Sequence, residues 1–119
     1  MPTPKTDLAE RLAHSREITI SVIGRTSGEE ISIPVWFVLE GKSLYLLPVQ
    51  GSETQWYKNV LHNPRIRVSA RGTSEFEATP IADAKAVSSV VERFREKYGT
   101  KDVAKYYSKL DVAVALQLK

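Results

Sequence analysis

The chain has 119 residues, of which 42% are hydrophobic and 26% charged, a composition typical of a globular domain with a modest core. It contains no cysteine and two histidines, which excludes disulfides, thiolate catalysis and cysteine-ligated zinc and argues against a metal site. Seventeen basic and fourteen acidic residues give a net charge of +3, which favours anionic ligands mildly and falls short of a nucleic-acid signature.

Neither a membrane span nor a targeting segment is expected from the sequence. No apolar run approaches the roughly 18 residues that a membrane span needs, and the first residues lack the apolar region of a signal peptide. No repeat or low-complexity linker divides the chain. We therefore expect one domain over residues 1–119, located in the cytoplasm.

The first predicted elements are a short helix, a strand and a turn. Thr6 can cap a helix over residues 6–15, and residues 18–22 alternate apolar with polar side chains, as a strand does. Residues 24–28, Gly-Arg-Thr-Ser-Gly, are permissive turn residues. A hairpin to the next strand is the expected result.

A second strand is predicted over residues 31–39 and a third over 44–49, joined by a turn at 40–42. Pro34 lies inside the second strand and cannot donate to a ladder, so this strand should be an edge, contain a bulge or meet a ligand. One face of the strand (Pro34, Trp36, Val38) stays apolar after the other has filled the core. This second apolar face predicts a homodimer.

A short helix is expected to begin at Ser52 and to stop at Asn63-Pro64. Ser52 and Gln55 have the Ser-x-x-Gln spacing of a capping box. The free N–H groups of the first turn would face the loop after the third strand, where they could hold a phosphate or a ring carbonyl. The alternative is a well-capped surface helix that packs Trp56 and Val60 inward.

Residues 65–71 and 75–81 alternate apolar with charged side chains of opposite sign, which predicts a hairpin. A three-residue loop at 72–74 would set Arg71 opposite Glu75 and would pair apolar with apolar residues beyond it: Ala70 with Phe76, Val68 with Ala78 and Ile66 with Pro80. The arginine and glutamate ladder is either a solvated sheet face or, at Arg65 or Arg67, a phosphate contact.

The C-terminal part reads as two helices and a last strand. Apolar residues recur at helical spacing from Val87 to Tyr98 with a stop at Gly99, a second helical piece starts at Lys101, and residues 112–118 alternate as a strand. Antiparallel hairpins without strand-helix-strand crossovers predict a mainly β (α+β) fold. We expect a split antiparallel β-barrel of about six strands with flanking helices.

Several short motifs in order resemble the deazaflavin-dependent nitroreductase family, within the FMN-binding split-barrel superfamily that includes pyridoxamine-phosphate oxidase. The resemblance spans residues 24–68 and rests on these segments: Gly24–Gly28, Pro34–Val38, Leu44–Leu46, Gly51-Ser52, Trp56–Asn59 and Asn63–Val68. It implies a homodimeric split barrel that binds FMN or a deazaflavin (coenzyme F-420). Glu29 and Glu30 depart from the family pattern, since relatives carry basic or small polar residues there.

The resemblance also implies a cofactor site. The phosphate end would lie near the turn of Arg25, Thr26 and Ser27 and near Gly51 and Ser52, with the ring along Pro34, Val35 and Trp36 and against Trp36 or Trp56. Structural alternatives exist for each group: Arg25 as a solvated charge, Trp36 as interface packing, and Tyr106 and Tyr107 as core residues rather than substrate or proton-donor groups.

Three functions remain open from the sequence. The first is a flavin- or deazaflavin-dependent oxidoreductase that passes hydride to a small organic acceptor, such as a nitro compound or quinone. It needs no acid-base dyad because the cofactor carries the hydride. The second is a non-catalytic split barrel that binds a cofactor, haem or another small ligand. The third, a small nucleic-acid-binding barrel, is opposed by the acidic partners of Arg65 and Arg67 and by the low net charge.

Overall fold

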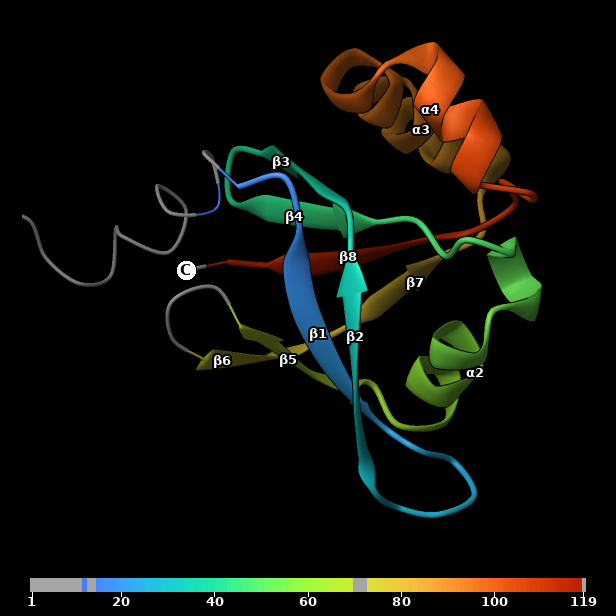
Figure 1. Ribbon diagram of the computed structural model, residues 1–119. Coiled ribbons are helices and arrows are strands. Elements are labelled where there is room, and N and C mark those ends of the chain that lie inside the picture. Colours follow the sequence, from blue (N-terminus) through green and yellow to red (C-terminus); the bar gives the residue numbers. More distant parts are fainter. Residues whose placement is uncertain (1–11, 13–14, 70–72, 119) are drawn as a thin grey trace, which may run out of the picture.

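Two four-stranded antiparallel sheets form the core of the computed structural model, which describes residue 12, residues 15–69 and residues 73–118 (Figure 1). The first sheet has the order β2-β1-β5-β6 and consists of Glu30–Val35, Ile18–Ile23, Arg65–Ser69 and Thr73–Glu77. The second has the order β3-β4-β8-β7 and consists of Phe37–Glu40, Ser43–Leu46, Ala113–Gln117 and Thr79–Ile81. The predicted split barrel with flanking helices is confirmed.

The helices lie outside these sheets. A 3-10 turn, η1 (Gly51–Glu53), leads into α2 (Gln55–His62), while α3 (Ala84–Tyr98) and α4 (Thr100–Tyr106) lie together at one end of the molecule (Figure 1). The predicted helices near the C-terminus are confirmed. The helix expected over 6–15 falls outside the described residues except for Leu12, which is buried, and Ser15. Among the described helices, none is long and apolar enough to cross a membrane.

Two of the predicted strands are each divided between the sheets. The run 31–39 breaks at Trp36, so β2 lies at the edge of the first sheet and β3 at the edge of the second. The run 75–81 breaks in the same way at Ala78, whose N–H donates to the Pro64 carbonyl (2.7 Å). Pro34 therefore lies on an edge strand, as predicted. The third strand ends at Leu46, earlier than the predicted Val49.

The second sheet is covered on both faces. One face contributes Phe37, Leu44 and Leu116 to the core between the sheets, and the other packs Val38 and Ala113 against α3 and α4. The face expected to stay exposed is thus largely covered within one chain: Val38 is 3% exposed and Trp36 stacks on Tyr98. The sequence argument for a homodimer loses this support, because α3 and α4 already cover this face of the second sheet within one chain.

The register predicted for the β5–β6 hairpin is wrong. Phe76 pairs with Ile66 and Thr73 with Ser69, so the partner of Phe76 moves from Ala70 to Ile66; residues 70–72 lie outside the described part. Alternation sets which face each side chain takes, and a shift by an even number of residues leaves those faces unchanged. The predicted partners Ala78 and Pro80 instead leave this sheet, and β7 pairs with β8. Opposite charges still face one another, Arg65 with Glu77 and Arg67 with Glu75.

Tyr98 fixes the point where the chain passes from β2 to β3. Its hydroxyl accepts the Phe37 N–H (3.1 Å) and lies within donating distance of the Arg16 and Phe37 carbonyls (2.7 and 2.9 Å). Its ring stacks on Trp36 with centroids 4.2 Å apart. Lys97, one residue earlier, donates to the same Phe37 carbonyl (3.0 Å) and lies 3.6 Å from the Phe37 ring centroid. The end of α3 therefore holds both backbone groups of Phe37.

Replacing Tyr98 with phenylalanine should destabilise the fold by about 1–3 kcal/mol, because the buried Phe37 N–H loses its acceptor while the ring stack remains. Urea unfolding measures the change. Tyr106→Phe is the matched control and should cost under about 0.5 kcal/mol, since Tyr106 is 50% exposed. Equal losses in the two variants would contradict the assigned role of the Tyr98 hydroxyl.

Lys97 should make stability rise with pH in the alkaline range. Burial, with a contribution from the Arg16 charge, lowers the pKa of Lys97 from 10.5 to about 8. Between these values the unfolded chain binds more protons than the native one at this site, so the free energy of unfolding increases with pH. Subtracting the pH profile of Lys97→Met from that of wild type should isolate this rise. The exposed Lys85 on the same helix is the control, and a Lys85→Met profile that differs from wild type as much would refute the assignment.

Candidate functional site

A largely apolar pocket of about 580 Å³ opens beside the β2 edge, between the start of α2 and the end of α4. Its walls come from five segments that are far apart in the sequence: the residue before β1, the β2 edge, the loop after β4, the first residues of α2 and the last of α4 with its C-cap. The lining residues are Glu17, Ile33, Pro34, Val35, Trp36, Leu47, Val49, Thr54, Gln55, Trp56, Tyr106 and Tyr107.

Four aromatic side chains form much of this wall. Trp36 is held by its stack on Tyr98 and meets Tyr106 edge to face, with centroids 5.4 Å apart. Tyr107 lies 6.1 Å from Trp36 by ring centroids, and Trp56 is 3% exposed. These are the two tryptophans of the sequence, and both line the pocket. An aromatic wall of this kind suits a planar conjugated ring.

The polar groups of the pocket are few, and among the described residues they include one charged side chain, that of Glu17. Thr54 and Tyr106 contribute hydroxyls and Gln55 an amide, and no lysine or arginine of the described part of the chain belongs to the lining. Burial raises the pKa of Tyr107, with a smaller contribution from Tyr98, so its hydroxyl stays neutral. Among the described residues, no group of three or more histidine, aspartate or glutamate side chains could hold a metal ion.

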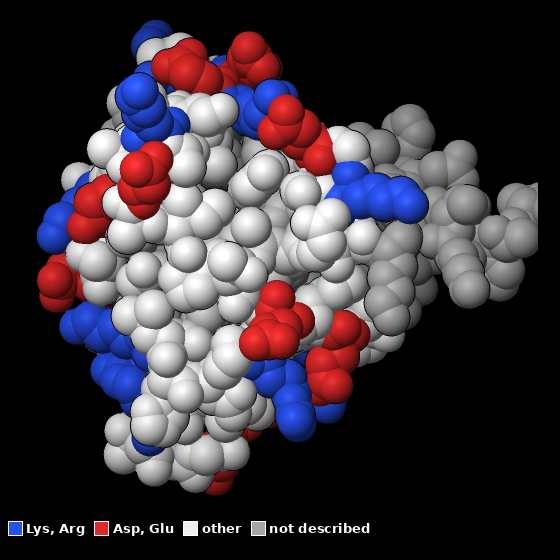
Figure 2. All heavy atoms as spheres, turned by 180° about the vertical axis from the view of Figure 1, so that it is seen from behind, with Lys and Arg blue, Asp and Glu red and all other residues white. Residues whose placement is uncertain are grey.

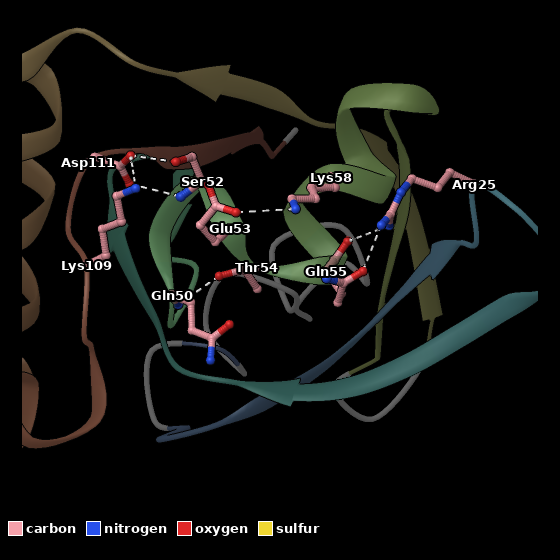
Figure 3. Close-up of polar contacts among 9 residues, drawn as sticks. All are labelled: Arg25, Gln50, Ser52, Glu53, Thr54, Gln55, Lys58, Lys109 and Asp111. Atoms are coloured by element: carbon pink, nitrogen blue, oxygen red, sulfur yellow. Dashed lines mark hydrogen bonds and ion pairs between the residues drawn. The ribbon is translucent and has the colours of Figure 1, made fainter.

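Arg25 reaches the pocket wall from the turn after β1. It donates through Nη2 to Gln55 Oε1 (2.7 Å) and through Nη1 to Asn59 Oδ1 (2.7 Å), with a longer contact to the Gln55 carbonyl (3.4 Å). Its backbone N–H also donates to Asn59 Oδ1 (3.1 Å). Figure 3 shows the Arg25 and Gln55 side chains pointing toward each other. Arg25 is therefore hydrogen-bonded to α2, and its side chain remains exposed to solvent.

The capping box expected at Ser52 is not formed. Ser52 belongs to η1, α2 begins at Gln55, and its N-cap is Thr54, whose hydroxyl accepts from the Gln50 N–H (2.7 Å) instead of capping the helix. Ser52 donates from its N–H and hydroxyl to Asp111 (2.9 and 2.6 Å; Figure 3). These hydrogen bonds lower the pKa of Asp111. Asp111, from the C-terminal segment, thus binds the Ser52 hydroxyl that was expected to cap the helix. The local Ser-x-x-Gln spacing could not reveal this distant partner.

The residues expected at the cofactor site fall into three groups. Pro34, Val35, Trp36 and Trp56 line the pocket, and Arg25 contacts its wall through Gln55. Thr26 and Ser27 lie exposed on the neighbouring turn, where Ser27 Oγ accepts from the Glu29 N–H. Gly51 and Ser52 lie beside Asp111 and outside the pocket lining.

Sequence reasoning did not identify Gln55 or Glu17 as site residues. Tyr106 and Tyr107 were considered both as core residues and as substrate or proton-donor groups; Tyr107 is buried, Tyr106 is half exposed, and both line the pocket. Neighbouring side chains point in different directions from a helix, so the adjacent Tyr106 and Tyr107 at the end of α4 should have different surroundings. This spacing was the signal available in the sequence. No comparable signal marked Glu17, which lies outside regular structure.

Arginines of the first sheet pair with acidic residues. Arg67 contacts Glu30 at 3.1 Å and Arg65 contacts Glu75 at 3.8 Å, with all four side chains largely exposed. Figure 2 shows charges of both signs around a broad uncharged centre on the rear face. Such pairing agrees with a solvated sheet face rather than a phosphate-binding stripe.

Comparison with solved structures shows the same fold at low sequence identity. An F420-H2 dependent reductase has 17% identity, covering 86% of this chain and 94% of its own, with a TM-score of 0.66. HutZ, the heme storage protein of Vibrio cholerae, has 14% identity, with coverage of 97% and 89% and a TM-score of 0.72. A structure described as a domain-swapped dimer has 16% identity, with coverage of 94% and 96% and a TM-score of 0.68. No curated protein matches the sequence.

These neighbours have different ligands, a reduced deazaflavin for one and heme for another, so the shared feature is the barrel. One family matches the sequence itself, over residues 8–118. The chain belongs to the family described as an uncharacterized protein conserved in bacteria, DUF2255.

Proposed function

We propose that the pocket binds the ring of FMN or of the deazaflavin coenzyme F-420, and that the protein is an oxidoreductase that uses this cofactor. The observation that carries the proposal is the apolar pocket lined by Trp36, Trp56, Tyr106 and Tyr107 beside the β2 edge. The F420-H2 dependent reductase with the same fold supports it.

The pocket fits the ring portion of such a cofactor. Its volume of about 580 Å³ is in the usual range for small-molecule sites, and its walls are mainly apolar. Pro34 has no N–H to offer, so a ligand at this edge leaves no donor unpaired there. Thr54 does not cap α2 with its side chain, which leaves first-turn N–H groups for a ring oxygen.

The phosphate end fits less completely, because the lining contributed by the described residues has no cationic side chain and includes Glu17. We place the phosphate toward the turn of Arg25, Thr26 and Ser27, which contacts the pocket wall through Gln55. The hydroxyls of Thr26 and Ser27 are exposed there. Ser52 donates to Asp111, so this hydrogen bond would have to break before Ser52 or the neighbouring Gly51 could bind the phosphate.

When bound, the cofactor supplies the hydride chemistry. The protein's residues bind and orient it: Trp36 and Trp56 contact the ring, and Val35 and Leu47 exclude water. Tyr106, half exposed at the pocket, borders the space left for a small organic acceptor such as a quinone or nitro compound. No acid-base dyad is needed for this transfer.

A homodimer is part of the proposal. Val49 and Tyr106 are large apolar side chains that remain 44% and 50% exposed, and both border the pocket. A second copy that covers them would close the pocket from water. The neighbour described as a domain-swapped dimer shows that this fold can dimerise. Sedimentation equilibrium at micromolar concentration should give twice the chain mass of 13.3 kDa, and a single 13.3 kDa species would contradict the dimer.

Truncating Tyr106 should weaken cofactor binding. Calorimetric titration of Tyr106→Ala with FMN and with coenzyme F-420 should give a dissociation constant raised about threefold to tenfold, the equivalent of one aromatic contact. Leu61→Ala is the control, because Leu61 is similarly exposed on α2 and lies outside the pocket. If wild type binds the cofactor and Tyr106→Ala binds it with the same dissociation constant, the end of α4 does not belong to the cofactor site.

Turnover separates the oxidoreductase from a non-catalytic ligand carrier. The favoured cofactor, reduced and held without oxygen, should be reoxidised by menadione or a nitroimidazole faster with protein than without it, as followed by absorbance. The carboxylate of Glu17 in the pocket lining favours the carrier as second candidate, because it would oppose a phosphate-bearing cofactor. Tight binding without any acceleration would establish the carrier and contradict the enzyme.

A further inference from the structure

The contact between Arg25 and Gln55 fixes the chemical orientation of the Gln55 amide. A guanidinium has donors only, so the amide atom at 2.7 Å from Arg25 Nη2 must be the oxygen. The amide nitrogen then occupies the other position of the side chain. Although amide oxygen and nitrogen are hard to tell apart by shape, the donor-only partner leaves one assignment here.

Arg25 is itself held in place on the side away from the pocket. Asn59 is 5% exposed and its Oδ1 accepts from both the backbone N–H and Nη1 of Arg25 (3.1 and 2.7 Å). A buried acceptor that takes two donors from one residue fixes both the turn and the guanidinium. The entropy cost of ordering the long arginine side chain is therefore met before any ligand arrives.

Gln55 lines the pocket at the first position of α2, and its amide nitrogen makes no hydrogen bond with another described residue. Within the described part of the chain, its two N–H donors are thus free for a ligand. We propose that Gln55 donates a hydrogen bond to a carbonyl or unprotonated nitrogen of the bound ring, and that Arg25 is a positioning residue that orients this donor. The inference rests on the proposed function, since the ring is that of a flavin or deazaflavin.

This role differs from a phosphate contact by Arg25. A phosphate contact would act on the phosphate-bearing cofactor alone, whereas orientation of Gln55 would act on the ring whether or not a phosphate is attached. Riboflavin and FMN carry the same ring and differ by the phosphate. Comparing them therefore separates the two roles of Arg25.

Gln55→Glu is the sharpest variant. A carboxylate keeps an acceptor for Arg25 and forms an ion pair with it, so thermal stability should be maintained. It removes the donor and places an acceptor against the ring carbonyl, so the dissociation constant for riboflavin should rise about tenfold or more. Riboflavin is neutral, which keeps repulsion between the new carboxylate and a phosphate out of the measurement.

Arg25→Ala should raise the dissociation constant for riboflavin about threefold to tenfold and that for FMN by at least the same factor, and the riboflavin effect should largely disappear in a Gln55→Ala background. Arg65→Ala, an exposed arginine on β5, is the matched control and should leave both unchanged. The binding is measured by calorimetric titration of the full chain. If the protein binds the deazaflavin and not FMN, coenzyme F-420 and its phosphate-free riboside replace FMN and riboflavin in this comparison.

Each outcome separates the claims. Loss of FMN affinity alone in Arg25→Ala would make Arg25 a phosphate ligand and overturn the positioning role. Wild-type affinity for riboflavin in Gln55→Glu would overturn the donor role while leaving the proposed function intact. Failure of the wild type to bind any of these ring compounds would contradict the proposed function and this inference together.

Discussion

The hydrogen bonds between the end of α3 and Phe37 are the constraint on which the rest of the structure depends. At Trp36 the chain leaves one sheet and enters the other, and such a crossing exposes backbone groups that neither sheet can pair. Tyr98 accepts the Phe37 N–H, and Lys97 donates to its carbonyl. The crossing is therefore stabilised by the end of a helix that lies 60 and 61 residues later in the chain.

The pocket follows from this crossing. Because Tyr98 stacks on Trp36, the indole is held at the β2 edge, where it also meets Tyr106 edge to face and lines the pocket. On the opposite side, Arg25 and Asn59 join the turn after β1 to α2 and set the position of Gln55. The site is thus assembled from two supports, one in each half of the chain, around an apolar space that accepts a flat ring.

The sequence was sufficient for the fold because periodic patterns report which face of an element is buried. Alternation predicted the strands, and Pro34 predicted the edge at which the pocket lies. Patterns could not show that a strand changes sheets at Trp36, since alternation continues through the break. The same limit led to the wrong hairpin register and to the misassigned Ser52, whose partner Asp111 is 59 residues away. Gln55 escaped notice as a site residue because its role depends on Arg25, 30 residues earlier.

Fluorine NMR of the protein labelled with 5-fluorotryptophan tests the central claim most directly, because the chain has two tryptophans and both line the pocket. Titration with FMN and with coenzyme F-420 should shift both resonances along one saturable curve for the cofactor that binds, since the ring contacts both indoles. A titration in which calorimetry shows saturation while neither resonance moves would place the cofactor elsewhere and contradict the account.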